Sequence, residues 1–309
     1  MESTDRTVRF KGFSKWIQFQ GVRVLFVFVQ LLPLKVVFFL GTIIGRIAYY
    51  SLISKRELVY RNIENLKNWS KEKEIQSSIL EQETEVLTKS LFIRNMENLL
   101  SSIFFLNKGK KRLHKSIKIE NLELFKKIYA KDKNVIILFA HMGPWELIFQ
   151  FTNLLSPIIE ASQMGCLYRP FNNYYTNRWY LNQRRRNGMK LFSRDDGFLG
   201  MIRFLKKETA LFVPFDIRLR EGVEVPLFGK PALTPNLSSF FYKNVKAPVL
   251  SFSITQCGYA QWNLKFYELP TSDIKAEEET LFLKRANQLL EQIILESPCD
   301  YFFFQNRYK

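Results

Sequence analysis

The chain has few of the residues that build disulfide frameworks and metal sites. Its 309 residues include only three cysteines and two histidines. Cys166, Cys257 and Cys299 are far apart, odd in number and in no ligand spacing, which argues against disulfide pairing and against a zinc site. A reducing, cytosolic environment is the default for such a sequence. Any histidine-dependent chemistry must use His114 or His141.

Glycine and proline are also scarce, with 13 and 11 residues, which excludes collagen-like and low-complexity classes. Acidic residues are the minority charge, because 29 Asp and Glu face 46 Lys and Arg, for a net charge of +17. A field of this sign attracts lipid headgroups, nucleic acid or acidic proteins. The 29 phenylalanines are unusually apolar for a nucleic-acid binder, so we expect no nucleic-acid partner. A hydrophobic content of 47% permits a sizeable core and excludes global disorder.

Residues 22–53 are mostly apolar but contain no long uninterrupted run. The longest charge-free run, Val24 to Leu34, is too short to cross ~30 Å of hydrocarbon. Reading on through Lys35 to Gly45 gives about 22 residues with one internal charge, although Pro33 would kink or end the helix. With basic flanks, the segment predicts a cytosolic-face membrane anchor that dips in or spans once. The alternative is two buried core helices.

The remaining chain predicts an α/β domain. Apolar residues at three- and four-residue spacing indicate helices over residues 54–130. After Asn134, short β-branched and aromatic runs predict strands, separated by helical stretches. The predicted strands are residues 135–140, 210–215, 247–255 and 261–269, with one more at 300–305. Strands alternating with helices are typical of the α/β class. We expect an anchor over residues 1–55 and a catalytic domain over residues 56–309.

The most specific local feature is His141-Met-Gly-Pro-Trp-Glu146. His141 leaves the end of a predicted buried strand, where open α/β sheets build their sites. If the following turn folds back, the Glu146 carboxylate can accept the imidazole N–H and fix its tautomer. The pair would then activate an external hydroxyl. The alternative is an ordinary strand-end histidine, with Glu146 as a carboxylate in the first turn of a helix.

A basic segment follows, residues 167–194. Arg169 precedes Pro170, which favours an extended backbone, and could bind phosphate bidentately or stabilise an oxyanion. Arg184–Arg186 form either a solvated helix face or part of a substrate site, for which Arg186 is the candidate. Basic residues interleaved with tyrosine and tryptophan also resemble an RNA-binding surface.

Residues 212–236 contain glycine, proline and the lone acid Asp216 directly after a predicted strand. This pattern indicates a site-forming loop followed by a short hairpin. The alternative is an ordinary connecting hairpin.

Taken in order, these motifs resemble one known family. The motifs are HMGPWE at 141–146, LYRPFNN at 167–173, SRDDGFLGMIRFLKK at 193–207, VPFD at 213–216, VPLFGKPALT at 225–234 and PCDYFFFQNRYK at 298–309. The chain resembles the lauroyl/myristoyl transferases of bacterial lipid A biosynthesis, part of the larger group of glycerolipid acyltransferases with His-X4-acid motifs. The resemblance covers most of the chain. It implies a mixed sheet flanked by helices behind the apolar N-terminal region.

The resemblance also implies an activity. A fatty acyl group would pass from acyl carrier protein to a hydroxyl of a lipid A precursor, at the cytoplasmic face of the inner membrane, without a metal or cofactor. His141 would be the base and Glu146 its orienter. Arg169 would stabilise the thioester oxygen or bind phosphate, and Asp216 is a weaker candidate for holding substrate or an arginine.

The chain departs from the family pattern at Ile217, Gln305 and Asn306, which puts the substrate headgroup and acceptor hydroxyl in doubt. Two alternatives remain open: an acyltransferase for another glycolipid or lysophospholipid, and a non-catalytic, basic membrane- or RNA-binding protein.

Overall fold

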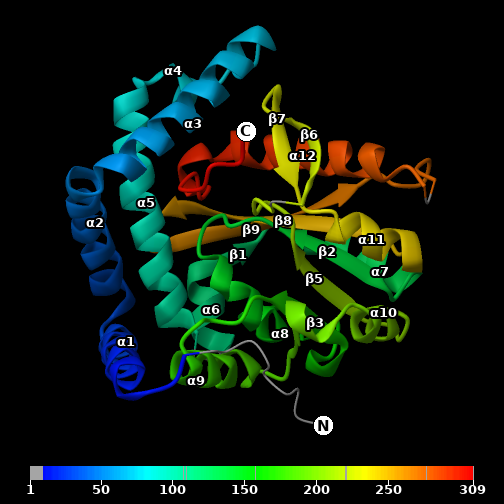
Figure 1. The fold of residues 1–309 in the computed structure, drawn as a ribbon, viewed down its shortest axis with the longest axis horizontal. Coiled ribbons are helices and arrows are strands. Elements are labelled where there is room, and N and C mark those ends of the chain that lie inside the picture. The colour runs from blue at the N-terminus through cyan, green and yellow to red at the C-terminus, as the bar shows by residue number, and fades with distance from the viewer. Residues whose placement is uncertain are drawn as a thin grey trace.

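The computed structural model describes residues 10–308 except 107, 109, 157, 220 and 276. Residues 1–9 of the predicted anchor therefore lie outside the described residues. The N-terminal part is helical: α1 (Phe13–Leu31), α2 (Leu34–Ser51), α3 (Ile53–Glu72), α4 (Ser78–Glu81), α5 (Thr84–Phe105) and α6 (Lys110–Ser116). In Figure 1, α5 stands beside one end of the sheet and α2 lies on the far side of α5.

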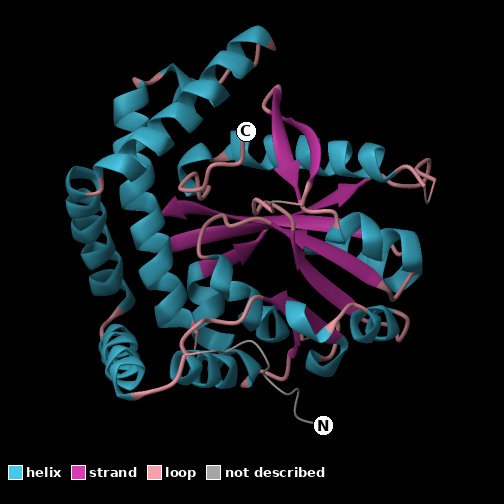
Figure 2. Ribbon diagram, viewed as in Figure 1, coloured by secondary structure: helices cyan, strands magenta, loops and turns pink. Residues whose placement is uncertain are grey.

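Strands and helices then alternate, which confirms the predicted α/β class (Figure 2). The strands are β1 (Ile117–Ile119), β2 (Val135–Phe139), β3 (Met164–Tyr168), β4 (Lys190–Ser193), β5 (Ala210–Pro214), β6 (Val223–Leu227), β7 (Lys230–Thr234), β8 (Val249–Gly258) and β9 (Gln261–Leu269). The remaining helices are α7 (Leu122–Lys131), η1 (Trp145–Gln150), α8 (Phe151–Leu154), η2 (Ala161–Gln163), α9 (Tyr174–Arg185), η3 (Arg194–Asp196), α10 (Leu199–Leu205), α11 (Leu237–Val245), α12 (Glu279–Glu296) and η4 (Pro298–Asp300).

The main sheet is mixed, as the family resemblance implied. Its strand order is β1-β9-β8-β2-β5-β3-β4, in which only β8 and β9 pair antiparallel. β6 and β7 form a separate antiparallel hairpin, as predicted for residues 212–236. The central strand β2 is buried along its whole length between β5 and β8, so its carboxyl end lies in the middle of the sheet edge.

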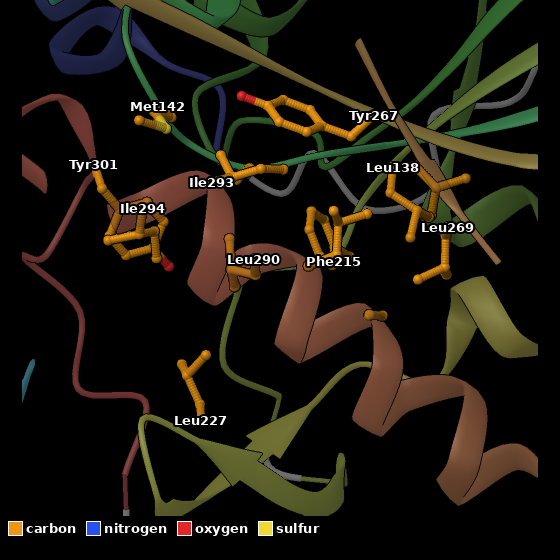
Figure 3. Packing of buried hydrophobic residues seen from close by; sticks show 14 of the residues in the cluster. Leu138, Met142, Phe215, Leu227, Tyr267, Leu269, Leu290, Ile293, Ile294 and Tyr301 are labelled. Atoms are coloured by element: carbon orange, nitrogen blue, oxygen red, sulfur yellow. The ribbon is translucent and has the colours of Figure 1, made fainter. Parts of the chain in front are cut away.

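Side chains of β2 alternate between two hydrophobic clusters. Leu138 packs on the face covered by α12, together with Phe215 and Ile293, as Figure 3 shows. Ile137 and Phe139 pack into the cluster on the opposite face. A strand buried on both faces reads as a continuous apolar run, which is why this strand could be predicted.

Residues 300–305 do not form the predicted strand. Pro298–Asp300 form a 3-10 turn, and only Tyr301 makes a bridge, to Met142. The aromatic residues here pack against other elements instead of pairing in the sheet: Phe302 lies against His141 and Trp145, and Phe304 lies against Phe92. Tertiary packing therefore outweighs their β propensity.

Pro33 separates α1 from α2, as its missing N–H predicts. Gly41 and Gly45 allow one face of α2 to pack closely on α5. A Cβ added at Gly41 would lie only 2.6 Å from the Glu97 Cα, and one added at Gly45 only 2.5 Å from the Ile93 Cα. α2 is long and apolar enough to cross a membrane by length and composition, with a mean hydropathy of 1.3 and 28% of it buried.

Candidate active site

His141 and Asp216 meet at the carboxyl edge of the sheet. Phe139 at the end of β2 pairs with Pro214 at the end of β5, and each residue of the site follows its strand by two positions. The imidazole Nδ1 lies 2.8 Å from Asp216 Oδ1, and the His141 main-chain N–H donates to Oδ2 at 2.8 Å. Both carboxylate oxygens are therefore engaged, and the imidazole orientation is fixed from two sides.

The pair has the electrostatics of a histidine base and its orienting acid. Burial lowers the pKa of His141, but the charge and hydrogen bond of Asp216 raise it more, with a smaller contribution from Glu146, so the net pKa lies above its ordinary value. Burial raises the pKa of Asp216, but His141 and Arg307 lower it below its ordinary value. An ionised Asp216 accepts a hydrogen bond from the Nδ1–H group, so the proton of the neutral imidazole stays on Nδ1 and the lone pair lies on Nε2.

The other ring nitrogen, Nε2, could receive a proton from a bound hydroxyl. The His141 side chain is 27% exposed, whereas Asp216 is fully buried. No partner for Nε2 is found among the residues that the structure describes. Rings of Trp145 and Phe302 lie 5.5 and 6.4 Å from the imidazole centre and give the site an apolar, aromatic wall.

The loop after His141 is held by the 3-10 turn η4. Gly143 donates its N–H to the Asp300 carbonyl, and Phe302 donates to the His141 carbonyl. Gly143 has φ +61°, and a Cβ there would lie 1.9 Å from the Ile254 carbonyl oxygen, so only glycine fits. The buried Asp300 carboxylate accepts in turn from Asn98. These contacts make the backbone around the base rigid.

Two residues near the C-terminus form hydrogen bonds with the main-chain carbonyl of Asp216. Gln305 Nε2 donates to the Asp216 carbonyl at 2.8 Å, and the same carbonyl accepts from Arg307. Gln305 Oε1 also accepts the Arg218 main-chain N–H at 3.3 Å, so this side chain bridges the loop that follows β5. Gln305 was noted in the sequence only as a departure from the family pattern, and its contact with Asp216 was not predicted.

We expect Gln305→Ala to lower kcat by about fivefold, since one hydrogen bond contributes about 1 kcal/mol and its loss would loosen the loop that carries Asp216. A weaker Asp216–imidazole contact should also move the acid limb of the pH–rate profile toward lower pH, because Asp216 raises the pKa of His141. The neighbouring variant Asn306→Ala is the control. An unchanged rate and an unchanged acid limb in Gln305→Ala would contradict this role.

Glu146 does not contact the imidazole, so the predicted hydrogen bond between them is wrong. Its two carboxylate oxygens instead accept from Arg184 on α9, Oε1 from Nη2 at 2.6 Å and Oε2 from Nε at 3.1 Å. The side chains are only 9% and 14% exposed, and the Arg184 guanidinium also lies 4.4 Å from the ring centres of Phe149 and Tyr180. Glu146 therefore links α9 to the loop that follows His141.

We expect Glu146→Gln to destabilise the protein by about 3–5 kcal/mol, because it leaves the Arg184 charge buried without its partner. Denaturant unfolding of the purified protein measures this difference. Glu123→Gln is the control, since its pair with Lys126 is exposed and should contribute less than about 1 kcal/mol. Adding Arg184→Met to Glu146→Gln should restore much of the loss. Equal stability of the two glutamine variants would show that the buried pair is not required.

The predicted substrate arginines lie at the surface. Arg169 directly follows β3, at the same sheet edge as His141, and is exposed. No hydrogen bond or ion pair to Arg169 is found within the described part of the chain. Arg186 is exposed at the end of α9, and no described contact brings it to His141. Among the described residues, no three His, Cys, Asp or Glu side chains are grouped so that they could hold a metal ion.

This geometry could deprotonate a hydroxyl, which is the class of chemistry that acyl transfer to an alcohol requires. Residues 4–309 match the family described as bacterial lipid A biosynthesis acyltransferase, so the chain belongs to that family and is an acyltransferase.

The chain is also similar to individual proteins and to one solved structure. The lipid A biosynthesis palmitoleoyltransferase of Escherichia coli K12 is 22% identical over 297 residues, covering 95% of this chain and 91% of that protein. The lipid A biosynthesis lauroyltransferase of the same organism is 21% identical over 304 residues, covering 95% and 92%. The 1-acyl-sn-glycerophosphate acyltransferase of Thermotoga maritima shares 15% identity, with a TM-score of 0.37, over 84% of this chain and 97% of that one.

Proposed function

We propose that the protein transfers a fatty acyl group from acyl carrier protein to a hydroxyl of a lipid A precursor. The observation that carries the proposal is the partly exposed imidazole of His141, whose Nδ1 is hydrogen-bonded to the buried Asp216. Family membership and relatives named as lipid A acyltransferases support the acceptor class. The net charge of +17 suits both an acidic carrier protein and a phosphorylated acceptor.

In the proposed reaction, Nε2 of His141 takes the proton of the acceptor hydroxyl while its oxygen attacks the thioester carbonyl. Asp216 stabilises the imidazolium. The tetrahedral intermediate collapses to the ester, the carbon–sulfur bond breaks, and the imidazolium returns its proton to the thiolate of the carrier. Arg169 stabilises the oxyanion or binds phosphate, and Arg186 contributes positive charge for the anionic substrates. Glu146 acts by holding Arg184 and α9.

The donor and acceptor can be tested with purified protein and labelled acyl groups. We expect transfer from acyl carrier protein to a lipid A precursor, and little transfer to a lysophospholipid. Preferred acylation of the lysophospholipid would replace the proposed acceptor, and absence of any transfer would favour a non-catalytic role.

We also propose that the protein rests on the cytoplasmic face of the inner membrane, with residues 1–55 as its anchor and residues 56–309 as the acyltransferase domain. All but five of the exposed large apolar side chains of the described residues lie between Phe10 and Ile53. These side chains lie mostly on α1 and α2, and burying them in lipid is favourable.

We expect the protein to stay with the membrane fraction in a high-salt wash, because salt screens charge but does not weaken apolar insertion. Fractionation of cells expressing the full chain measures this. Release into the soluble fraction would show that the attachment is electrostatic and that α1 and α2 do not insert.

A further inference from the structure

A pocket lies away from the catalytic site, where α2 ends and α3 begins. It has a volume of about 440 Å³ and is lined by α2, α3 and α5. The lining residues are Tyr49, Arg56, Glu57, Tyr60, Arg61, Glu85 and Thr88. Pockets of this size accommodate small polar molecules and headgroups. Tyr49 belongs to the hydrophobic core, but neither the core nor the hydroxyl chemistry of His141 accounts for Arg56 and Arg61.

Two arginines of the pocket have no carboxylate partner among the described residues. Arg56 is partly buried and lies 5.3 Å from the centre of the Tyr49 ring, within the range of a cation–π contact. Within the described residues, neither Arg56 nor Arg61 forms an ion pair with a carboxylate. Planar guanidinium groups bind phosphate bidentately, so two of them at one pocket suit a phosphate ligand.

The pocket also holds two acidic residues. Glu85 accepts a hydrogen bond from the Tyr49 hydroxyl at 2.9 Å but keeps its negative charge. Lys89 adds a third cation, with its ammonium 6.0 Å from the centre of the Tyr49 ring, so that three cations outweigh Glu57 and Glu85. Glu57 is exposed and offsets part of the positive charge. Its removal should therefore strengthen the binding of an anion.

The position of the pocket indicates where the phosphate comes from. The exposed apolar side chains of α2 and the α2–α3 junction include Ile47, Tyr50, Leu52 and Ile53, and the first cations of α3 follow at once. Such a change from apolar to aromatic and basic side chains marks the depth of lipid headgroups at a membrane surface. We propose that this pocket binds the phosphate headgroup of an anionic membrane lipid, separately from the acceptor at His141. The depth argument rests on the proposed docking of α1 and α2 in the membrane.

The test is binding of the full chain to vesicles of phosphatidylcholine with and without phosphatidic acid. We expect Arg56→Gln/Arg61→Gln to weaken binding to the phosphatidic acid vesicles by about tenfold or more, since each basic residue near an anionic surface contributes about 1 kcal/mol. Binding to pure phosphatidylcholine should not change. Arg203→Gln/Lys207→Gln removes two exposed cations from α10 and its C-terminal end and is the matched control. An equal loss in the control would show that only general positive charge is used.

Two further measurements separate the remaining explanations. Glu57→Gln should bind phosphatidic acid vesicles more tightly, a change in a direction that misfolding does not produce; weaker or unchanged binding would contradict the proposal. Stabilisation by inorganic phosphate alone that depends on Arg56, without vesicle selectivity, would assign the pocket to free phosphate and overturn the lipid assignment. Acyl transfer by wild-type protein in detergent micelles tests the proposed function independently, so the two can fail separately.

Discussion

Asp216→Asn is expected to lower kcat by about 10⁴-fold, the loss typical when the orienting acid of a histidine base becomes an amide. The structure determines how the amide would lie. Because Oδ2 accepts the His141 main-chain N–H, the amide oxygen must take that position and the NH₂ group must face Nδ1. Nδ1 would accept a hydrogen bond from this NH₂ group, so the proton of the neutral imidazole would lie on Nε2. A protonated Nε2 cannot accept the proton of a hydroxyl.

The pH–rate profile of the wild type and of Asp216→Asn provides a second measurement. The wild-type acid limb should lie above pH 6.5, because the net pKa of His141 is raised and only the neutral imidazole is a base. Removing the Asp216 charge should move the limb of the residual activity to lower pH. Asp273→Asn is the control, since this exposed acid pairs with Arg285 away from the site. A loss of less than about tenfold in Asp216→Asn would contradict the role of Asp216 as orienter.

His141→Ala is expected to lower turnover by about 10²–10⁴-fold, which is the usual contribution of a positioned general base. The measurement is transfer of a labelled acyl group by purified, folded protein. His114→Ala is the control, because His114 is exposed on α6.

The losses in His141→Ala and Asp216→Asn should not add, since both residues act on one proton transfer. The double variant should therefore be about as active as the poorer single variant. Wild-type turnover by His141→Ala would exclude the proposed mechanism, whereas additive losses would show that Asp216 has a separate task.

The parts of the fold that could be predicted are those with a continuous pattern. Strands β2, β5, β8 and β9 are largely buried and rich in β-branched and aromatic residues, and each was predicted. Strand β3 reads MGCLY, without a β-branched residue, and β1 and β4 have only three and four residues, so they give no signal above that of a loop.

The partners within the site could not be predicted from local spacing. Asp216 was identified as a strand-end acid, but its contact with His141 follows from β2 and β5 being neighbours in register, which depends on the strand order. The spacing in the sequence predicts that Glu146 contacts His141. Its partner in the structure is Arg184, which is 38 residues away in the chain and lies beside Glu146 because α9 packs there. The local sequence thus predicted the candidate site residues, and the tertiary structure determines which of their side chains contact one another.

The contacts that build the site join parts of the chain that are far apart. The His141–Asp216 bond spans 75 residues, the Arg307–Asp216 bond spans 91 and the Asn98–Asp300 bond spans 202. Contacts of such separation must overcome loop-closure entropy before they stabilise the fold, which slows folding. Under the proposed mechanism, a chain that had formed the N-terminal helices but not these contacts would lack the base, so acyl transfer would report on completion of the whole α/β domain.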